Sequence, residues 1–348
     1  MIAELTNKLS LYQDLNYDEM SGIMDELLKG QISSEEAANF LRNLTDKGES
    51  DEELLAMLDK MQQHAIHISP KRPGRIIDVC GTGGDKMRTF NVSTTAAFVI
   101  NSVGGTIAKH GNRSVSGISG SADIFEYFGY DLNMPPERVT EIIEKCGIGF
   151  MFAQKFHPAM KNIAEARKIL GIRTAFNLLG PLSNPAGVRN QLVGVFSADY
   201  LERIVLLLKA RGAENVMSVL SHDGLDELST TSKNQICHLK DGKISIRILN
   251  PQDFGLAKSN LSDIQVSSKD EAIKSFITVL KGTANKSMIE ITALNAAAGL
   301  IISGIVNDFY EAIPMALDSI KSGKSYNAFR DFIRFCGNIE KVEEFEKS

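Results

Sequence analysis

The chain has 348 residues, of which 43% are hydrophobic and 23% charged, and its formal net charge is −5. This balance is typical of globular proteins and excludes wholesale disorder, a fibrous repeat and a multi-span membrane protein. Its length suggests two domains at about 150 residues each, and its acidic charge argues against general nucleic-acid binding. The four cysteines lie far apart, so we expect no disulfide framework, no zinc site and a cytoplasmic protein.

The first 70 residues are predicted to form three or four short helices. Apolar residues repeat at helical spacing over residues 20–28, and two capping boxes, Ser33 with Glu36 and Ser50 with Glu53, begin later helices. A unit this small buries little surface alone, so we expect it to pack on the rest of the chain or on another subunit.

After a linker at residues 70–74 the pattern changes to alternating strands and helices. Strands are predicted at 75–80, 106–109, 191–196 and 216–221, with an exposed strand at 243–249. Helices are predicted at 93–101, 159–170, 200–211, 269–280, 291–306 and 308–322. The apolar window 289–306 contains polar residues, so a buried helix is favoured over a membrane span. Strand, helix and strand in succession predict a parallel sheet.

A glycine-rich turn, Gly81-Thr82-Gly83-Gly84-Asp85, follows the first predicted strand. The segment Asn91-Val92-Ser93-Thr94 then opens a helix. Glycines let a ligand approach the backbone, and a helix N-terminus favours anions, so the combination suits a phosphate or pyrophosphate. The alternative is a tight turn before an ordinary helix cap.

A second polar segment follows the next predicted strand. It runs from Lys109 to Asp123 and contains two cations, a histidine, several hydroxyls and three glycines. Ligands of open α/β sheets bind at such strand ends, and the two turns could face one ligand. The alternative is a solvated loop with two basic residues.

Together these two segments resemble the anthranilate phosphoribosyltransferase family. Later segments at 157–160, 171–185, 223–227 and 253–256, together with Arg167, extend the resemblance in order along the chain. One departure is Lys86-Met87-Arg88, which follows Asp85 where the family usually has a glycine.

The resemblance implies a fold with a small all-helical domain and a larger α/β domain. The helical domain would comprise residues 1–71 with helices near 165–190 added. The α/β domain would comprise residues 72–164 and 191–348, with a central, mostly parallel sheet flanked by helices. The family also implies a homodimer through the helical domain.

The resemblance implies transfer of the phosphoribosyl group from 5-phosphoribosyl 1-pyrophosphate to the amino group of anthranilate. The products are N-(5-phosphoribosyl)anthranilate and pyrophosphate, in a step of tryptophan biosynthesis. Because the leaving group is highly anionic, it needs Mg²⁺ (two ions per subunit) and backbone N–H groups more than a nucleophile. We therefore expect no catalytic nucleophile or triad, no nucleic-acid partner and no membrane.

Site residues follow from the resemblance, position by position. The phosphoribosyl pyrophosphate set is Gly81, Gly84, Asp85, Thr89, Asn91, Val92, Ser93, Thr94, Lys109, His110, Gly111, Asn112, Arg113, Ser114, Val115, Ser116, Gly117 and Ser121. The anthranilate set is Gly81, Asn112, Arg167, His110, His157 and Pro181, with Arg167 matched to the substrate carboxylate. The metal set is Ser93, Asp226 and Glu227, and Mg²⁺ commonly takes one or two carboxylates plus substrate phosphates.

Two alternatives remain at this point. A pyrimidine nucleoside phosphorylase-like enzyme shares the fold and a glycine-rich phosphate loop, but its own base-binding signature is absent. A nucleic-acid-binding, non-enzymatic relative is disfavoured by the net charge and by the intact Asp226-Glu227 pair.

Overall fold

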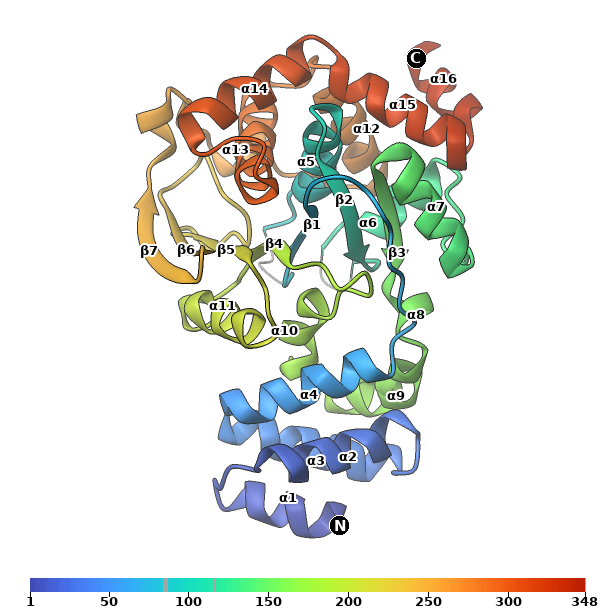
Figure 1. Cartoon of the computed structure of the whole chain (residues 1–348), viewed down its shortest axis with the longest axis vertical. Coiled ribbons are helices and arrows are strands. Elements are labelled where there is room, and N and C mark those ends of the chain that lie inside the picture. Colours follow the sequence, from blue (N-terminus) through green and yellow to red (C-terminus); the bar gives the residue numbers. More distant parts are fainter. Residues whose placement is uncertain (84–86, 115–116, 348) are drawn as a thin grey trace. The chain divides into compact units, whose positions relative to one another are not determined.

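The computed structural model describes residues 1–83, 87–114 and 117–347. The chain forms two compact units (Figure 1). The helical unit comprises Met1–His67 and Ala153–Pro185, and the α/β unit comprises Ile68–Phe152 and Ala186–Ser348.

The helical unit is a bundle of short helices from two separate segments of the chain. The first segment supplies α1 (Ile2–Ser10), α2 (Tyr17–Leu28), α3 (Ser34–Lys47) and α4 (Asp51–Gln63). The second supplies α8 (Ala153–Phe156), the 3₁₀ turn η1 (Pro158–Met160), α9 (Lys161–Leu170) and α10 (Ala175–Leu182). Helix α9 packs on α2 and α3, and α10 packs on α4, so the second segment completes the core that the first cannot close alone. Both predicted capping boxes are confirmed, at Ser33 and Ser50.

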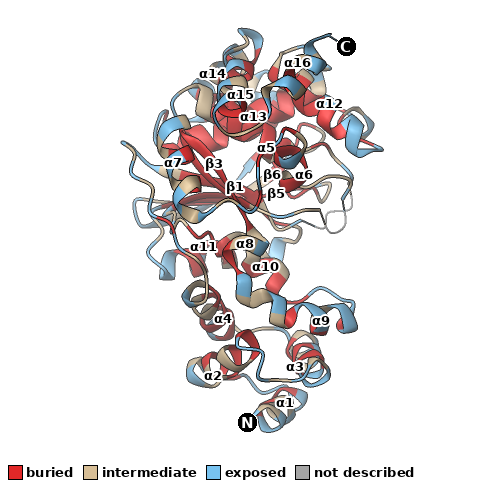
Figure 2. Ribbon diagram, turned by 90° about the vertical axis from the view of Figure 1, so that its right-hand side faces the viewer, coloured by how far each residue is buried: buried red, intermediate tan, exposed pale blue. Residues whose placement is uncertain are grey.

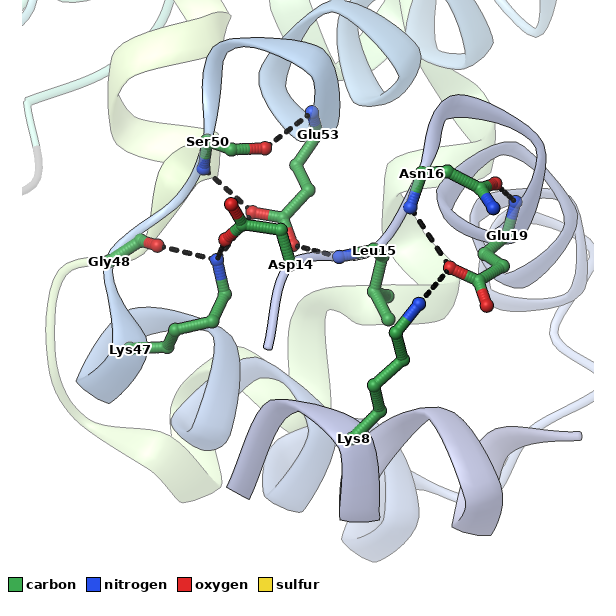
Figure 3. Close-up of polar contacts among 9 residues, drawn as sticks. All are labelled: Lys8, Asp14, Leu15, Asn16, Glu19, Lys47, Gly48, Ser50 and Glu53. Atoms are coloured by element: carbon green, nitrogen blue, oxygen red, sulfur yellow. Dashed lines mark hydrogen bonds and ion pairs between the residues drawn. The ribbon is translucent and has the colours of Figure 1, made fainter. Parts of the chain in front are cut away.

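A buried carboxylate ties the helical unit together (Figure 3). Glu53 has a fully buried side chain, accepts N–H bonds from Leu15 and Ser50 at 2.9 and 2.7 Å, and pairs with Lys47 at 2.9 Å. Lys47 also pairs with Asp14 at 2.5 Å. Burial alone would lower the pKa of Lys47, but these two carboxylates outweigh it and the pKa is raised. One charged cluster therefore fixes the α1–α2 connection to the start of α4.

The α/β unit is built on a seven-stranded sheet in the order β3-β2-β1-β4-β5-β6-β7 (Figure 1). The strands are β1 (Ile76–Gly81), β2 (Thr106–Gly111), β3 (Ile148–Phe152), β4 (Asn190–Gly194), β5 (Asn215–Ser221), β6 (Asn234–Lys240) and β7 (Lys243–Leu249). The first five pair in parallel, and β6 and β7 add an antiparallel edge. The predicted fold class, a small helical domain with a larger, mostly parallel α/β domain, is confirmed.

Helices cover both faces of this sheet. They are α5 (Val92–Ser102), α6 (Ser121–Tyr127), α7 (Pro136–Cys146), α11 (Leu201–Ala210), α12 (Lys269–Leu280), α13 (Lys286–Ser303), α14 (Phe309–Lys321), α15 (Lys324–Cys336) and α16 (Ile339–Lys347), with 3₁₀ turns η2 (Ala198–Tyr200), η3 (Pro251–Phe254) and η4 (Leu261–Asp263). Asn215 reaches α13 whereas Ser218, three residues along β5, reaches α11, so these two helices cover opposite faces.

Helix α13 is the central helix of the α/β core. It packs on α5, α14, β1, β4 and β5, and Figure 2 shows it buried along nearly its whole length. The apolar window at 289–306 is therefore a core helix, as predicted. Within residues 1–83, 87–114 and 117–347, no helix combines the length and apolar character that a bilayer crossing requires.

Candidate active site

Two adjacent carboxylates lie against the end of β1. Asp226 Oδ2 accepts a hydrogen bond from the Gly83 N–H at 2.6 Å, and Glu227 Oε1 accepts one from Ser93 Oγ at 2.7 Å. Both acidic residues are at most 9% exposed. The structure thus brings together the three predicted metal residues, Ser93, Asp226 and Glu227, beside the glycine-rich turn.

A pair of glycines makes room for this arrangement. Gly81 on β1 and Gly194 on β4 are partners in the parallel register. A Cβ atom on Gly81 would lie 2.6 Å from Asp226 Oδ2, and one on Gly194 would lie 1.6 Å from the Asp226 backbone oxygen. Both distances are far below van der Waals contact, so only glycine fits at these two strand ends.

The first turn of α5 directs polar groups to the same place. Asn91 at the helix N-cap donates to the Ser119 carbonyl at 3.0 Å, and Thr94 Oγ1 lies 2.9 Å from Ser121 Oγ at the start of α6. Asn91 Oδ1 and Thr82 Oγ1 are buried with no hydrogen-bond partner within the described part of the chain. A helix start with free N–H groups next to unsatisfied polar oxygens is suited to a polar, anionic ligand.

The oxygen atoms of Ser93, Asp226 and Glu227 suit Mg²⁺ that is also bound by a phosphate. Across the residues that the structure describes, no three His, Cys, Asp or Glu side chains form a metal-binding group. Asp226, Glu227 and Ser93 offer hard oxygen donors, and Mg²⁺ commonly combines one or two carboxylates with waters and substrate phosphates. The residues present therefore fit a cation that arrives with a phosphate ligand.

The end of β2 adds a buried lysine and a buried histidine. Lys109 is 1% exposed, and its Nζ donates to the Val79 carbonyl on β1 rather than reaching solvent. The His110 N–H donates to Asp78 Oδ1 at 3.3 Å, and Asp78 is completely buried. The predicted role of Lys109 in substrate binding stays a prediction, because its ammonium lies against the sheet backbone in this structure.

Arg113 is held by carboxylates of α6. Its two terminal nitrogens reach the two oxygens of Glu126 at 2.6 and 2.7 Å, and Nη1 lies 3.5 Å from Asp123. Glu126 chiefly accounts for the raised pKa of Arg113. Asp123 also accepts from Lys269 and the Gly120 N–H at 2.9 and 2.8 Å. Arg113 must therefore exchange a protein carboxylate for any phosphate that it binds.

The remaining predicted residues of the α/β unit lie on the same segments. Thr89 bridges Gln265, Val92 is buried, and Asn112 Oδ1 accepts from the Arg113 N–H at 2.8 Å. Gly111 ends β2, Ser121 begins α6, and Ser114 and Gly117 lie between them. Gly84, Asp85, Val115 and Ser116, and Lys86 of the noted departure, lie outside the described residues.

Three predicted anthranilate residues belong to the helical unit. The Arg167 guanidinium on α9 lies 5.7 Å from the centre of the Phe176 ring on α10, and burial lowers its pKa. No carboxylate pairs with Arg167 within the described part of the chain. His157 is 5% exposed, and burial lowers its pKa to about 4, so it is neutral near pH 7. Pro181 lies inside α10 and is half-buried. Arg167 is thus a semi-buried cation beside an aromatic ring.

Sequence reasoning missed several residues that shape the site. Gly194 and Asp78 carried no motif signal, although Asp78 is a charged residue inside an apolar strand. Asn234 and Asn295 hold the backbone just after Glu227 and were also missed. A polar residue within a predicted buried element is the sequence signal that could have indicated Asp78 and Asn295.

Comparisons with known proteins agree with this geometry. Residues 2–65 match the glycosyl transferase family helical bundle domain, and residues 73–326 match the α/β domain of the same family. The fold and site are therefore those of a glycosyltransferase with a helical bundle and an α/β domain.

More specific relatives define the family. The anthranilate phosphoribosyltransferase of Nitrosopumilus maritimus is 59% identical over 99% of both chains, and that of Cenarchaeum symbiosum is 45% identical over 97% of this chain and 98% of its own. The crystal structure of the Thermus thermophilus enzyme has a TM-score of 0.88 at 36% identity, covering 95% of this chain and 99% of its own. The Saccharomyces cerevisiae enzyme in complex with PRPP and Mg has a TM-score of 0.84 at 27% identity, covering 96% and 97%. The chain belongs to the anthranilate phosphoribosyltransferase family.

Proposed function

We propose that this protein transfers the phosphoribosyl group of 5-phosphoribosyl 1-pyrophosphate to the amino group of anthranilate, through the residues described above. The observation that carries the proposal is the contact of Ser93 with Glu227 and of Gly83 with Asp226, which joins a helix start to a buried carboxylate pair. A phosphate-binding helix start and a cation-binding acidic pair are the two elements that a pyrophosphate leaving group requires.

The α/β unit binds the phosphoribosyl donor in this proposal. The N–H groups of Ser93 and Thr94 lie in the first turn of α5, where the helix dipole favours phosphate oxygens. Asn91 Oδ1 is an acceptor without a donor, and a ribose hydroxyl would supply one. Thr89 and the 109–121 segment complete the predicted set.

Mg²⁺ would be held by Asp226, Glu227 and Ser93, and when bound it neutralises negative charge on the departing pyrophosphate. The family resemblance implies two ions per subunit, and Asp226 and Glu227 offer four carboxylate oxygens beside Ser93. Counting bound Mn²⁺ per subunit by electron paramagnetic resonance tests the number, and one ion per subunit would contradict it.

Arg167 binds the anthranilate carboxylate in this proposal. It has no carboxylate partner within the described chain, whereas Arg113 has two, so a substrate carboxylate would be its first ion pair. A guanidinium forks onto a carboxylate in a fixed orientation. His157, His110 and Pro181 are assigned to the aromatic substrate, and the low pKa of His157 keeps that residue uncharged beside it.

Bond changes at the ribose are balanced without a protein nucleophile. The anthranilate nitrogen forms a bond to C1 while the bond from C1 to the pyrophosphate oxygen breaks, and pyrophosphate leaves with that electron pair. The nitrogen then loses one proton, which the released pyrophosphate or water accepts. The protein accelerates the step by holding the two substrates in line and by stabilising the leaving charge.

A fluorescence assay tests the proposal. Anthranilate fluorescence should fall when the protein receives anthranilate, 5-phosphoribosyl 1-pyrophosphate and Mg²⁺, and excess EDTA should stop the loss. No loss with fresh substrate would overturn the assignment. Phosphorolysis of uridine or thymidine would support the nucleoside phosphorylase alternative, and a gel shift at physiological salt would support the nucleic-acid-binding alternative.

The predicted homodimer is supported by apolar residues on the surface of the helical unit. Leu11, Tyr12, Ile169 and Ile172 are 62%, 73%, 48% and 47% exposed. A dimer through this unit would cover exposed apolar residues of this kind. Light scattering after size exclusion should give twice the 38.1 kDa chain mass, and a monomer would contradict the proposal. The predicted cytoplasmic location is supported by the four cysteines, none of which forms a disulfide in the described part of the chain.

A further inference from the structure

Two buried asparagines hold the peptide groups that follow the carboxylate pair. Asn295 on α13 accepts the Leu228 N–H at 3.0 Å and donates to the Leu228 carbonyl at 2.7 Å. Asn234 at the start of β6 accepts the Ser229 N–H at 2.7 Å and donates to the Ser229 carbonyl at 2.9 Å. Each side-chain amide thus hydrogen-bonds both the N–H and the carbonyl of one residue, and these two residues, Leu228 and Ser229, are consecutive.

These contacts are shielded from water. Asn295 is 1% exposed and Asn234 is completely buried. A second donor bond from Asn295 to the Ile291 carbonyl, at 2.9 Å, fixes its side chain to its own helix. Buried hydrogen bonds of this kind cannot be replaced by water, so removing one amide leaves two backbone groups of the loop unsatisfied.

The same loop is constrained from the other side by the sheet. Gly194 and Gly81 let the Asp226 backbone and carboxylate lie directly on β4 and β1. The backbone at Asp226 therefore packs against Gly81 and Gly194 of the sheet, and the two residues that follow Glu227 are hydrogen-bonded by Asn295 and Asn234. A backbone held on both sides sets the direction in which the two side chains leave it.

We propose that Asn295 and Asn234 are positioning residues that aim the Asp226 and Glu227 carboxylates at the metal-bound pyrophosphate. The inference rests on the proposed function, because it presumes that this pair serves a cation. Neither asparagine contacts the reacting atoms. Each acts through the backbone of Leu228 or Ser229, as partners of metal ligands commonly do.

The test measures metal binding directly, without turnover. Mn²⁺ is titrated into the protein with saturating 5-phosphoribosyl 1-pyrophosphate and no anthranilate, and free Mn²⁺ is followed by electron paramagnetic resonance. Asn295→Ala should raise the apparent Mn²⁺ dissociation constant about 10–100-fold, the usual effect of losing a partner of a metal ligand. If Asn295→Ala does not fold, Asn234→Ala makes the same test at Ser229.

Asn215 supplies a matched control. It is also 1% exposed and also donates to a carbonyl of α13, that of Ile302 at 3.1 Å, but it lies at the start of β5, away from the carboxylate loop. Asn215→Ala should lower the melting temperature comparably and change the Mn²⁺ constant less than about twofold.

The outcomes separate the two proposals. A large shift for Asn295→Ala with little for Asn215→Ala supports the positioning role, and equal shifts or no shift overturn it. If the wild-type protein itself binds no Mn²⁺ in the presence of 5-phosphoribosyl 1-pyrophosphate, the proposed function fails and the positioning role fails with it.

Discussion

The buried polar clusters of the two units differ in how their hydrogen bonds are completed. In the helical unit, the Glu53 carboxylate receives two backbone N–H groups and the Lys47 ammonium, all from the chain itself (Figure 3). In the α/β unit, Thr82 Oγ1 just after β1 and Asn91 Oδ1 at the N-cap of α5 are buried without a partner in the described chain. An unsatisfied buried polar group costs about 1–3 kcal/mol. The first cluster is satisfied by the chain itself, whereas the second leaves two buried polar oxygens that the proposed substrate would satisfy.

Removing the carboxylates of Asp226 and Glu227, which lie beside the second cluster, should have the largest effect. Asp226→Asn combined with Glu227→Gln should lower kcat/KM at least about a thousandfold, because the leaving pyrophosphate loses its cation. Steady-state assays over a Mg²⁺ series measure this. Glu343→Gln with Glu344→Gln removes an adjacent acidic pair from α16 and is the control. Similar losses in both double variants would sink the assignment.

Breaking the self-contained cluster should instead affect stability. Glu53→Gln leaves Lys47 without its buried partner and should cost about 3 kcal/mol in the free energy of unfolding, measured by urea denaturation. The control Glu19→Gln alters a half-buried pair with Lys8 and should cost less than about 1 kcal/mol. Equal costs would contradict the comparison.

The Lys47 pair also predicts a direction with pH. Because the folded-state pKa of Lys47 is raised, its contribution is fully present below the unfolded lysine pKa of about 10.4 and is lost as pH rises through the folded value. Wild-type stability should therefore fall more steeply above pH 10 than that of Lys47→Met. Parallel alkaline melting curves would show that the pair contributes nothing.

Arg167 should give a smaller effect that is confined to one substrate. Arg167→Ala should raise the anthranilate KM about 10–100-fold through loss of a charged hydrogen-bond pair, and leave the 5-phosphoribosyl 1-pyrophosphate KM nearly unchanged. Arg138, which lies 4.6 Å from the Phe335 ring centre on the α/β unit, supplies the control Arg138→Ala. If the KM of both substrates rises equally, the carboxylate assignment is wrong.

The smallest effect concerns the carboxylate that occupies Arg113. Glu126→Gln weakens an exposed pair worth about 0.2–1 kcal/mol, so the 5-phosphoribosyl 1-pyrophosphate KM should fall about twofold as Arg113 is released. Glu141→Gln alters the similar exposed pair with Arg138 and should leave this KM unchanged. A higher KM in Glu126→Gln would mean that Glu126 orients Arg113 productively.

Elements with strong local signals were predicted from the sequence. The helix at 269–280 and the exposed edge strand at 243–249 match α12 and β7 in both bounds, because a clear period marked each. Strands β3 and β6 were not predicted, since Ile148–Phe152 is a five-residue run without alternation and Asn234–Lys240 is rich in polar residues. Tertiary pairing, rather than local pattern, makes them strands.

The second segment of the helical unit shows the same limit. Helices near 165–190 were expected to join that unit, and the structure groups Ala153–Pro185 with it, because α9 packs on α2 and α3. Such packing over long sequence separation has no local signature. The domain boundaries themselves stay a prediction, since a domain is defined by independent folding.

The site was predictable as far as motifs extend. Ser93, Asp226 and Glu227 were assigned from the family resemblance, and the structure places them together. Their neighbours Gly194 and Asn295 were missed. Gly194 lets the Asp226 backbone approach β4, and Asn295 hydrogen-bonds the Leu228 backbone, and sequence spacing reveals neither contact.

The close contact between Gly194 and the Asp226 backbone predicts which substitutions position 194 can accept. Since even a methyl group there would lie 1.6 Å from the Asp226 backbone oxygen, the mildest substitution, alanine, is already excluded by hard-sphere overlap. In a saturation library selected for tryptophan synthesis, position 194 should tolerate no replacement. Gly187 has open space around it and should accept several, although its φ of +58° strains each of them. The loop that carries Asp226 and Glu227 can therefore pack on β4 only because residue 194 has a hydrogen atom as its side chain.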